Sequence, residues 1–270
     1  MKTLQILLFI LFISFVVRAS DNYPAGARAI ALSDAFVSIS DVWSAFHNQA
    51  ALSEINRFSA GVFYESRFMI DELSLAAGTI VFPVPGGSAG FSFYQFGKGT
   101  YKESKLGLAY SKQLSEKLSA AIQIDYFLNR FPENEKAFGF ATFEAGVSYH
   151  LSNEFTIAAH VFNPVQNGFT TYYGKEKMPL IFRIGGHYEL ADKVLVSAEI
   201  QNRLHEQTLV KTGIEFYPIQ NFALRMGASG KPLKYSAGLG YKIGKISTDI
   251  AFSYHGNLGF SPSVSLQFSL

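Results

Sequence analysis

The chain has 270 residues, of which 48% are hydrophobic and only 16% are charged, with 26 Phe, 14 Tyr and 23 Gly. Soluble domains usually carry about 25% charged residues, so this composition indicates that something apolar covers much of the surface. The 23 basic and 21 acidic residues provide no basic surface for nucleic acid, and the absence of Cys excludes disulfides, thiol catalysis and a lipid-modified Cys.

The first residues are typical of a secretory signal peptide. Lys2 is followed by an apolar run over residues 4–17 and by the small-residue site Val17-Arg18-Ala19. A charged start, an apolar stretch and a cleavage site in this order direct a chain into the secretory pathway. The alternative is a membrane anchor, but the run is shorter than the roughly 20 residues that a spanning helix needs. We therefore expect residues 1–19 to be removed.

The next segment, residues 20–56, shows no strand alternation. Between residues 25 and 55 it mixes apolar residues with small and polar ones, a composition suited to short helices and tight turns. A floppy periplasmic extension would expose nine apolar residues, including the only Trp, which is unfavourable. We expect this segment to fold into the lumen of a barrel as a plug. Its candidate functional residues are Arg28, Asp34, Asp41, Trp43 and Asn48.

From residue 57 to the end, apolar and polar residues alternate with period two, which places one set of side chains on each face of a strand. Leu118, Ile122 and Tyr126, for example, share one face, while Gln123 and Asp125 share the other. Each segment is near the roughly nine to eleven residues that a tilted strand needs to cross a bilayer. We expect fourteen strands, at approximately 57–68, 72–83, 88–97, 103–114, 118–130, 138–151, 155–163, 178–190, 194–203, 207–217, 222–229, 233–243, 246–255 and 261–270.

The connections between these strands alternate in length. Short ones, such as Pro85-Gly86-Gly87 and Gly244-Lys245, follow even-numbered strands, whereas longer ones, such as residues 131–137, follow odd-numbered strands. Ser229-Gly230-Lys231, which also follows an odd-numbered strand, is short. Outer-membrane barrels have short periplasmic turns and longer external loops. The pattern therefore predicts an even number of strands, with both ends of the barrel in the periplasm of an outer membrane.

Aromatic residues lie near the ends of many predicted strands, as at Tyr110, Tyr126, Tyr149 and Tyr188. A soluble β-sandwich or lipocalin-like barrel would turn its apolar faces into one core. Rings at strand ends instead fit the two interfacial girdles of a membrane barrel. We expect an all-β protein, a transmembrane antiparallel β-barrel of about 14 strands over residues 57–270, with an N-terminal helical plug segment in its lumen.

Charged residues of both signs recur on the polar faces of the strands. We expect five of them to form a network across the lumen: Arg183, Glu199, Lys211, Glu215 and Arg225. The expected pairs are Arg183 with Glu199, Lys211 with Glu199 or Glu215, and Arg225 with Glu215. One interpretation is a structural network that rigidifies a filled interior, and the other is a selective path for a polar solute. Mixed signs create no net field for one type of ion, which favours the structural network.

No pattern in the chain indicates catalysis. It contains no Gly-x-Ser-x-Gly nucleophile motif and no His-x-x-x-His or HExxH spacing. We therefore expect no enzyme activity, no catalytic residue, no cofactor and no metal, with the His side chains of the strands hydrogen-bonded in the lumen.

The connection over residues 163–177 is the longest loop, and it contains Phe169, Tyr172 and Tyr173. Long loops in compact folds are often functional. Exposed rings at its tip would anchor a partner protein or cover a lateral opening. The alternative, which the sequence supports equally, is that the loop packs over the mouth of the barrel.

The stretch Gly26-Ala27-Arg28-Ala29-Ile30-Ala31, followed by Asp41-Val42-Trp43-Ser44-Ala45-Phe46 and Asn48-Gln49-Ala50-Ala51-Leu52, resembles the N-terminal segment of PorV/PorQ-type proteins within the FadL superfamily. Members of that group commonly show a GARAxGMGGAF-like opening and an Asn-Pro-Ala-Gly-Leu element. The chain departs from this pattern at Ala31 and Ser33, where glycine is usual, at Gln49 for Pro and at Ala51 for Gly. Further similar stretches, such as Thr212-Gly213-Ile214-Glu215-Phe216, follow in the same order along the barrel.

The resemblance implies a partner-binding barrel in or beside the type IX secretion system. Such a protein would act in protein transport as an accessory subunit of a membrane protein complex, in contact with outer-membrane lipid and with other outer-membrane or secreted proteins. FadL relatives instead pass hydrophobic small molecules through a plugged barrel. The leading prediction is the secretion-associated barrel, and the alternative is a transporter that binds a hydrophobic ligand.

Overall fold

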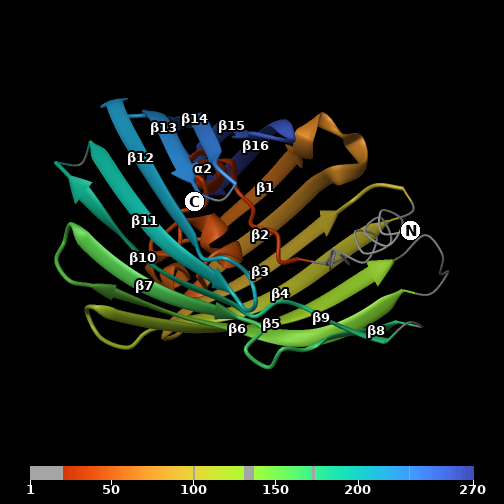
Figure 1. The fold of residues 1–270 in the computed structure, drawn as a ribbon. Coiled ribbons are helices and arrows are strands. Elements are labelled where there is room, and N and C mark those ends of the chain that lie inside the picture. Colours follow the sequence, from red (N-terminus) through yellow and green to blue (C-terminus); the bar gives the residue numbers. More distant parts are fainter. Residues whose placement is uncertain (1–20, 100, 131–136, 172–173, 192, 231) are drawn as a thin grey trace.

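Fourteen antiparallel strands close into a barrel around a short N-terminal segment (Figure 1). This computed structural model describes residues 21–99, 101–130, 137–171, 174–191, 193–230 and 232–270. The expected signal peptide at residues 1–19 therefore lies outside the described residues. The prediction of a fourteen-strand antiparallel barrel is confirmed.

Every barrel strand begins and ends within three residues of its predicted bounds. The barrel strands are β1 (Ser59–Ser66), β2 (Ser74–Val84), β3 (Gly87–Phe96), β4 (Lys102–Gln113), β5 (Leu118–Arg130), β6 (Phe138–His150), β7 (Phe155–Phe162), β10 (Ile181–Leu190), β11 (Val194–Arg203), β12 (Leu209–Ile219), β13 (Phe222–Ser229), β14 (Lys234–Ile243), β15 (Ile246–His255) and β16 (Gly259–Ser269). The segment that was predicted as one loop, 163–177, contains a further hairpin of β8 (Gly168–Thr171) and β9 (Gly174–Lys177).

Each strand pairs with its neighbour along the chain, β7 pairs with β10 across the β8–β9 hairpin, and β1 pairs with β16 to close the sheet. The connection between β14 and β15 and the other turns that follow even-numbered strands of the predicted order lie at one end of the barrel, which we call the turn end. The other end, which we call the loop end, carries the connections between β1 and β2, β3 and β4, and β7 and β10. In Figure 1 the loop end lies to the right.

The side chains alternate between the lumen and the exterior along every barrel strand, and the exterior is apolar. On β4, for example, Leu106 and Leu108 are 43% and 64% exposed, while Lys105 and Ala109, which precede and follow them, are buried. Exposed rings mark both ends of the exterior, with Tyr110, Tyr149, Tyr188 and Tyr241 near the turn end and Tyr64, Tyr126, Tyr235 and Tyr254 near the loop end. A closed sheet with an apolar exterior satisfies every backbone group in lipid. None of the helices in the described part of the chain has the length and apolar character needed to cross a membrane.

The N-terminal segment fills the middle of the lumen as a plug, which we define as residues 21–55. It contains the helix α2 (Ala27–Ala31) and the 3₁₀ turns η1 (Val42–Phe46) and η2 (Gln49–Glu54). Figure 1 shows α2 inside the barrel; it contacts β14 and β15, while η2 contacts β4, β5 and β6. Its largest side chains, including the fully buried Trp43, have left water, which stabilises the closed plug by ~1.5–3 kcal/mol for each large apolar side chain.

Local capping and close approach explain why this segment adopts short turns. The Asp41 carboxylate accepts from the backbone N–H of Trp43 at 2.7 Å and begins η1, and the Asn48 side chain accepts from the N–H of Ala50 and begins η2. The plug lies so close to the wall that a Cβ at Gly227 would stand 2.5 Å from the Leu32 carbonyl carbon. Only glycine at this position on β13 leaves room for the plug backbone.

Candidate functional site

An ion-pair network joins the plug to the wall near the turn end. Arg28 donates from Nε and Nη2 to the Glu215 carboxylate at 2.9 and 2.7 Å, and from Nη1 to Asp41 at 3.2 Å. Arg225 also pairs with Glu215, and it donates to Asp249 at 2.6 Å. Buried charges are stable only when they are paired and hydrogen-bonded. The network therefore fixes α2 and the start of η1 against β12, β13 and β15.

A second group of contacts holds the plug backbone at mid-height. The Glu199 carboxylate accepts from the backbone N–H groups of Phe36 and Val37 at 3.1 and 3.0 Å, and from Lys211 Nζ at 2.8 Å. Lys211 also donates to the Asp34 carbonyl at 3.2 Å. One wall ion pair thus satisfies three backbone groups of the plug, a role that supports a structural function for the pair.

Strand register explains which of the expected charge pairs form. Glu199 lies opposite Lys211 in the β11–β12 ladder, and Glu215 lies opposite Arg225 in the β12–β13 ladder. Residues directly opposite each other on one face are the closest cross-strand neighbours. The pairs Lys211–Glu199 and Arg225–Glu215 are accordingly present.

The expected pair Arg183–Glu199 is not formed among the described residues, whereas Lys211, which was expected to pair with Glu199 or Glu215, pairs with Glu199. Glu199 lies opposite Gly185 rather than Arg183 in the β10–β11 ladder. Arg183 donates instead from Nη1 to the His47 carbonyl at 3.1 Å. The expectation was wrong because it considered only wall residues, whereas the plug supplies backbone acceptors inside the lumen.

Two plug side chains, Asp34 and His47, have pKa values far below those of the same groups in water. Burial by itself raises the pKa of Asp34, but Lys234, whose Nζ donates to Asp34 at 3.1 Å, and Lys211 outweigh it and lower that pKa to about 2. Burial lowers the pKa of the His47 imidazole to about 4, so the ring is neutral. Its Nε2 lies 3.0 Å from the Ala25 carbonyl oxygen. Both groups hold the plug in a defined charge state at neutral pH.

A fully buried ionic cluster ties both ends of the plug to the opposite wall. Lys105 Nζ donates to Glu144 at 2.5 Å and to the Asn22 side chain at 3.1 Å. The other Glu144 oxygen lies 2.8 Å from His160 Nε2 and accepts from the Gln49 side chain at 2.9 Å. The cluster therefore links the start of the plug and η2 to the wall strands β4, β6 and β7.

The loop end of the lumen is lined mainly by aromatic side chains, with Arg67, Glu103 and Lys105 beside them. We call this group the aromatic cluster; it comprises Tyr23, Tyr94, Phe96, Phe127, Phe140, Phe162 and Phe169, all of them buried. The rings of Phe127 and Phe140 stack with their centroids 4.9 Å apart, and Phe169 from the β8–β9 hairpin lies 6.1 Å from Phe140. Such contacts between rings add about 0.5–1.5 kcal/mol each to the gain from burial. This end of the lumen is an apolar environment beneath the hairpin.

The wall ladder is interrupted beside the aromatic cluster. The pairing of β6 with β7 stops at Glu144 and Phe162, because the chain turns at Asn163, whose φ of 53° is left-handed. In place of a strand, the Asn163 N–H donates to the Phe143 carbonyl at 3.1 Å, and the Asn167 side chain donates to the neighbouring Ala141 carbonyl at 2.7 Å. Near the loop end, two asparagines thus replace the strand partner of β6 on its β7 side, while β5 stays paired on the other side.

The structure bears on only one of the three expected loop residues. Phe169 is 2% exposed and packs on Phe140, so it covers the mouth of the barrel instead of presenting a ring to solvent. Tyr172 and Tyr173 lie outside the described residues. The position of Phe169 agrees with the packing alternative for this connection.

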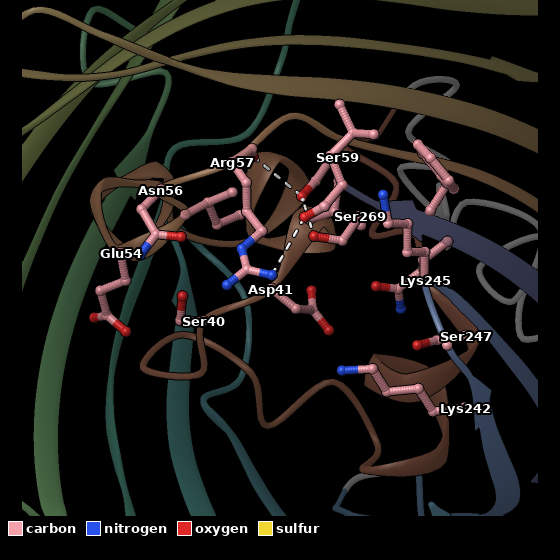
Figure 2. A pocket seen from close by; sticks show the side chains of 16 residues that line it. Ser40, Asp41, Glu54, Asn56, Arg57, Ser59, Lys242, Lys245, Ser247 and Ser269 are labelled. Carbon is pink, nitrogen blue, oxygen red and sulfur yellow. Dashed lines mark hydrogen bonds between the residues drawn. The ribbon is translucent and has the colours of Figure 1, made fainter.

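A polar pocket opens at the turn end, below the plug. It has a volume of about 490 Å³ and lies between η1, the approach to β1 and the β14–β15 turn. Figure 2 shows Arg57, Lys242 and Lys245 around it, with Asp41 at its inner side. A second cavity of about 210 Å³ shares Asp41 and Lys242 and extends toward Arg28. In the described part of the chain, no three His, Cys, Asp or Glu side chains gather as a metal site.

The sequence-based expectation missed the aromatic cluster and Lys105. The alternation of inward-facing and outward-facing residues along each strand was sufficient to find both. Lys105 shares the inward face of β4 with Ala109, and Phe127 shares the inward face of β5 with Asp125. Large rings on an otherwise polar face at the loop end were the signal.

The fold is shared with solved outer-membrane barrels. The toluene transporter TodX of Pseudomonas putida aligns with a TM-score of 0.68 at 12% identity, over 94% of this chain and 99% of that one. The toluene transporter TbuX of Ralstonia pickettii gives 0.67 at 10% identity, over 91% and 98%. A FadL homologue of Pseudomonas aeruginosa gives 0.61 at 11% identity, over 93% and 98%.

Identities this low establish a common barrel fold and nothing finer. No protein-family model and no curated protein sequence matches the chain. What the barrel does therefore has to be argued from its lumen.

Proposed function

We propose that this protein conducts apolar small molecules across the outer membrane, with its turn end facing the periplasm. The observation that carries the proposal is the aromatic cluster at the loop end of the lumen. Barrels that pass polar solutes have a polar, water-filled interior. Here an entering solute meets buried rings such as Phe127 and Phe140 instead, which favour a molecule that gains free energy by leaving water.

The plug favours exit of such a solute through the barrel wall rather than along the lumen. The ion pairs Lys105–Glu144 and Lys211–Glu199 lie further along the lumen, toward the turn end. An apolar molecule cannot solvate these charges. Beside the rings, β6 is paired with β5 but has no ladder partner on its β7 side from Phe138 to Phe143, and the exterior there faces lipid. Passage from the cluster through the interrupted ladder into the bilayer is therefore the route with the smallest desolvation cost.

The names of the similar structures support an aromatic solute. TodX and TbuX are described as toluene transporters, and they share the barrel fold of this chain. A toluene-sized ring matches the flat faces that the cluster offers. We take toluene as the probe.

The test is uptake of toluene by vesicles that contain the purified protein. Because the chain has no Cys, the double variant Phe140→Cys/Phe169→Cys can be joined by a short thiol-reactive crosslinker that fixes the hairpin on β6. We expect crosslinking to lower the protein-dependent uptake at least about tenfold, which corresponds to ~1.4 kcal/mol of added barrier.

The matched control is the single variant Phe169→Cys, which cannot be crosslinked. It should take up toluene at the same rate with and without the reagent. A protein that adds no toluene uptake to vesicles, or a crosslinked form that is as fast as the control, contradicts the proposal.

A second candidate is a partner-binding barrel associated with protein secretion, as the resemblance to PorV/PorQ-type proteins implies. The turn-end pocket favours it, because Arg57, Lys242 and Lys245 offer cations to an acidic segment of a periplasmic or secreted protein. Pulldown in mild detergent from native membranes tests it. A stoichiometric partner that is lost in Lys242→Ala/Lys245→Ala, with toluene uptake unchanged, would support this role.

A further inference from the structure

Near the start of the plug, the ring of Tyr23 lies between aromatic and charged side chains of the barrel wall. Tyr23 stacks on Phe96 with a centroid distance of 4.3 Å and meets the edge of Tyr94 at 5.5 Å. The Arg67 guanidinium lies 4.6 Å from the centre of the Tyr23 ring, and the Tyr23 hydroxyl donates to the Glu103 carboxylate at 3.1 Å. We call the surrounding residues, Arg67, Tyr94, Phe96 and Glu103, the Tyr23 cradle.

The chain segment that carries Tyr23 is held by side chains alone. Residues 21–25 belong to no helix or strand. Asp21 pairs with Arg203 at 2.8 Å, its carbonyl accepts from the Tyr94 hydroxyl at 3.0 Å, and Asn22 accepts from Lys105. Withdrawal of the segment therefore breaks no strand ladder. The segment turns at Gly26, whose φ of 109° is readily adopted by glycine and rarely by residues with a Cβ.

The Tyr23 cradle recognises two features of its occupant, an aromatic ring and a hydroxyl group. Phe96 and Tyr94 supply flat and edge contacts for a ring, and Arg67 adds a cation–π contact. Glu103 supplies an acceptor for a hydroxyl. Burial, with the Glu103 charge as the second cause, raises the pKa of the Tyr23 phenol above its ordinary range, so the hydroxyl remains a donor.

We propose that the Tyr23 cradle is a binding site for small phenolic compounds, occupied in this structure by the chain's own Tyr23. The inference deepens the proposed function and rests on it, since it names the class of molecule that enters the aromatic cluster. A ligand from the loop end replaces Tyr23, forms the same ring contacts and donates the same hydrogen bond to Glu103. Toluene would fill the ring site but would make no hydrogen bond to Glu103, which would keep its bond from the Tyr101 hydroxyl.

The experiment compares p-cresol, the side chain of tyrosine as a free molecule, with toluene in calorimetric titrations of the purified full chain in detergent. Tyr23→Ala empties the cradle, whereas Tyr23→Phe keeps it filled with a ring that lacks the hydroxyl. We expect Tyr23→Ala to bind p-cresol at least about tenfold more tightly than the wild type, because the competing side chain is gone. Tyr23→Phe should show no such gain.

The preference for the hydroxyl identifies the cradle as the site. Tyr23→Ala should favour p-cresol over toluene by about tenfold or more, since p-cresol adds a charge-assisted hydrogen bond to Glu103 that toluene cannot form. Adding Glu103→Gln should reduce this preference several-fold, because the hydrogen bond loses its charge assistance. Heat-dependent gel mobility and the emission of Trp43 verify that each variant is folded.

Two results would overturn the inference: Tyr23→Ala binding p-cresol no more tightly than the wild type, or a preference for p-cresol that Glu103→Gln leaves unchanged. Toluene uptake by vesicles is measured on the same preparations. Uptake without phenol selectivity removes only the inference, whereas phenol selectivity without uptake removes only the proposed conduction.

Discussion

The two ends of the lumen hold the plug by different forces. At the turn end, Arg28, Glu215 and Arg225 form a buried ionic network, in which removing one partner leaves the others uncompensated. At the loop end, the Asp21–Arg203 ion pair and the Tyr23–Glu103 hydrogen bond hold the start of the plug. Rings such as Phe140 and Phe169 fill the space beside it through non-directional contacts that another apolar molecule can replace. The difference indicates that the turn end is the fixed anchor of the plug and the loop end is its adaptable part.

The largest expected effect comes from breaking the anchor. Glu215→Gln removes the carboxylate shared by Arg28 and Arg225, and we expect it to destabilise the plug by ~3–5 kcal/mol, the typical cost of an uncompensated buried charge. Denaturant unfolding followed by the emission of Trp43, the only Trp and fully buried, reports the change. Glu116→Gln, in an exposed turn, is the control and should have no effect. Equal stability of the two variants would show that the network is not an anchor.

Acid should loosen the plug through His47. Burial lowers its pKa from 6.5 to about 4, so the unfolded state takes up a proton first as the pH falls. Stability is therefore full above pH 6.5 and declines between 6.5 and 4, by about 3 kcal/mol in total at ~1.4 kcal/mol per pH unit. His47→Gln should flatten this part of the curve of unfolding free energy against pH. A wild type with a flat curve over this range would contradict the expectation.

Crowding the wall against the plug should have a smaller effect. Gly227→Ala places a Cβ 2.5 Å from the Leu32 carbonyl carbon, and overpacking of this kind costs about 1–3 kcal/mol. We expect the plug to shift, which would raise the ion conductance of single barrels in planar bilayers. Gly256→Ala is the matched control, because no atom lies within 4 Å of its added Cβ. Identical conductance for both variants would mean that this contact does not position the plug.

The same comparison shows what the sequence was able to predict. Alternation with period two specified the barrel strands, because lipid outside and charge inside impose opposite polarity on successive residues, as at Leu106 and Lys105. It also specified the directly opposed pair Lys211–Glu199, once the register is known. A linear pattern contains no information about the plug backbone, which is why the contact of Arg183 with the His47 carbonyl was not anticipated.

The β8–β9 hairpin shows a second limit. Its strands have only four residues each, too few for alternation to be recognised. The break before it depends on the left-handed backbone of Asn163, which asparagine tolerates but does not require. Short elements that follow a strand break are therefore fixed by three-dimensional contacts, here those of Phe169 with Phe140.

The smallest expected change in stability sharpens the comparison most. Phe169→Leu keeps an apolar side chain on Phe140 but loses the contact between the two rings, and we expect it to lower the unfolding free energy by about 0.5–1.5 kcal/mol, the usual contribution of such a contact. Because the smaller side chain weakens the cover over the aromatic cluster, uptake of toluene into vesicles should nevertheless rise several-fold. Stability and uptake would then separate at the loop end, whereas Glu215→Gln changes stability first. If Phe169→Leu destabilised the protein as much as Glu215→Gln does, the rings would be a rigid core, and an adaptable loop end would have to be abandoned.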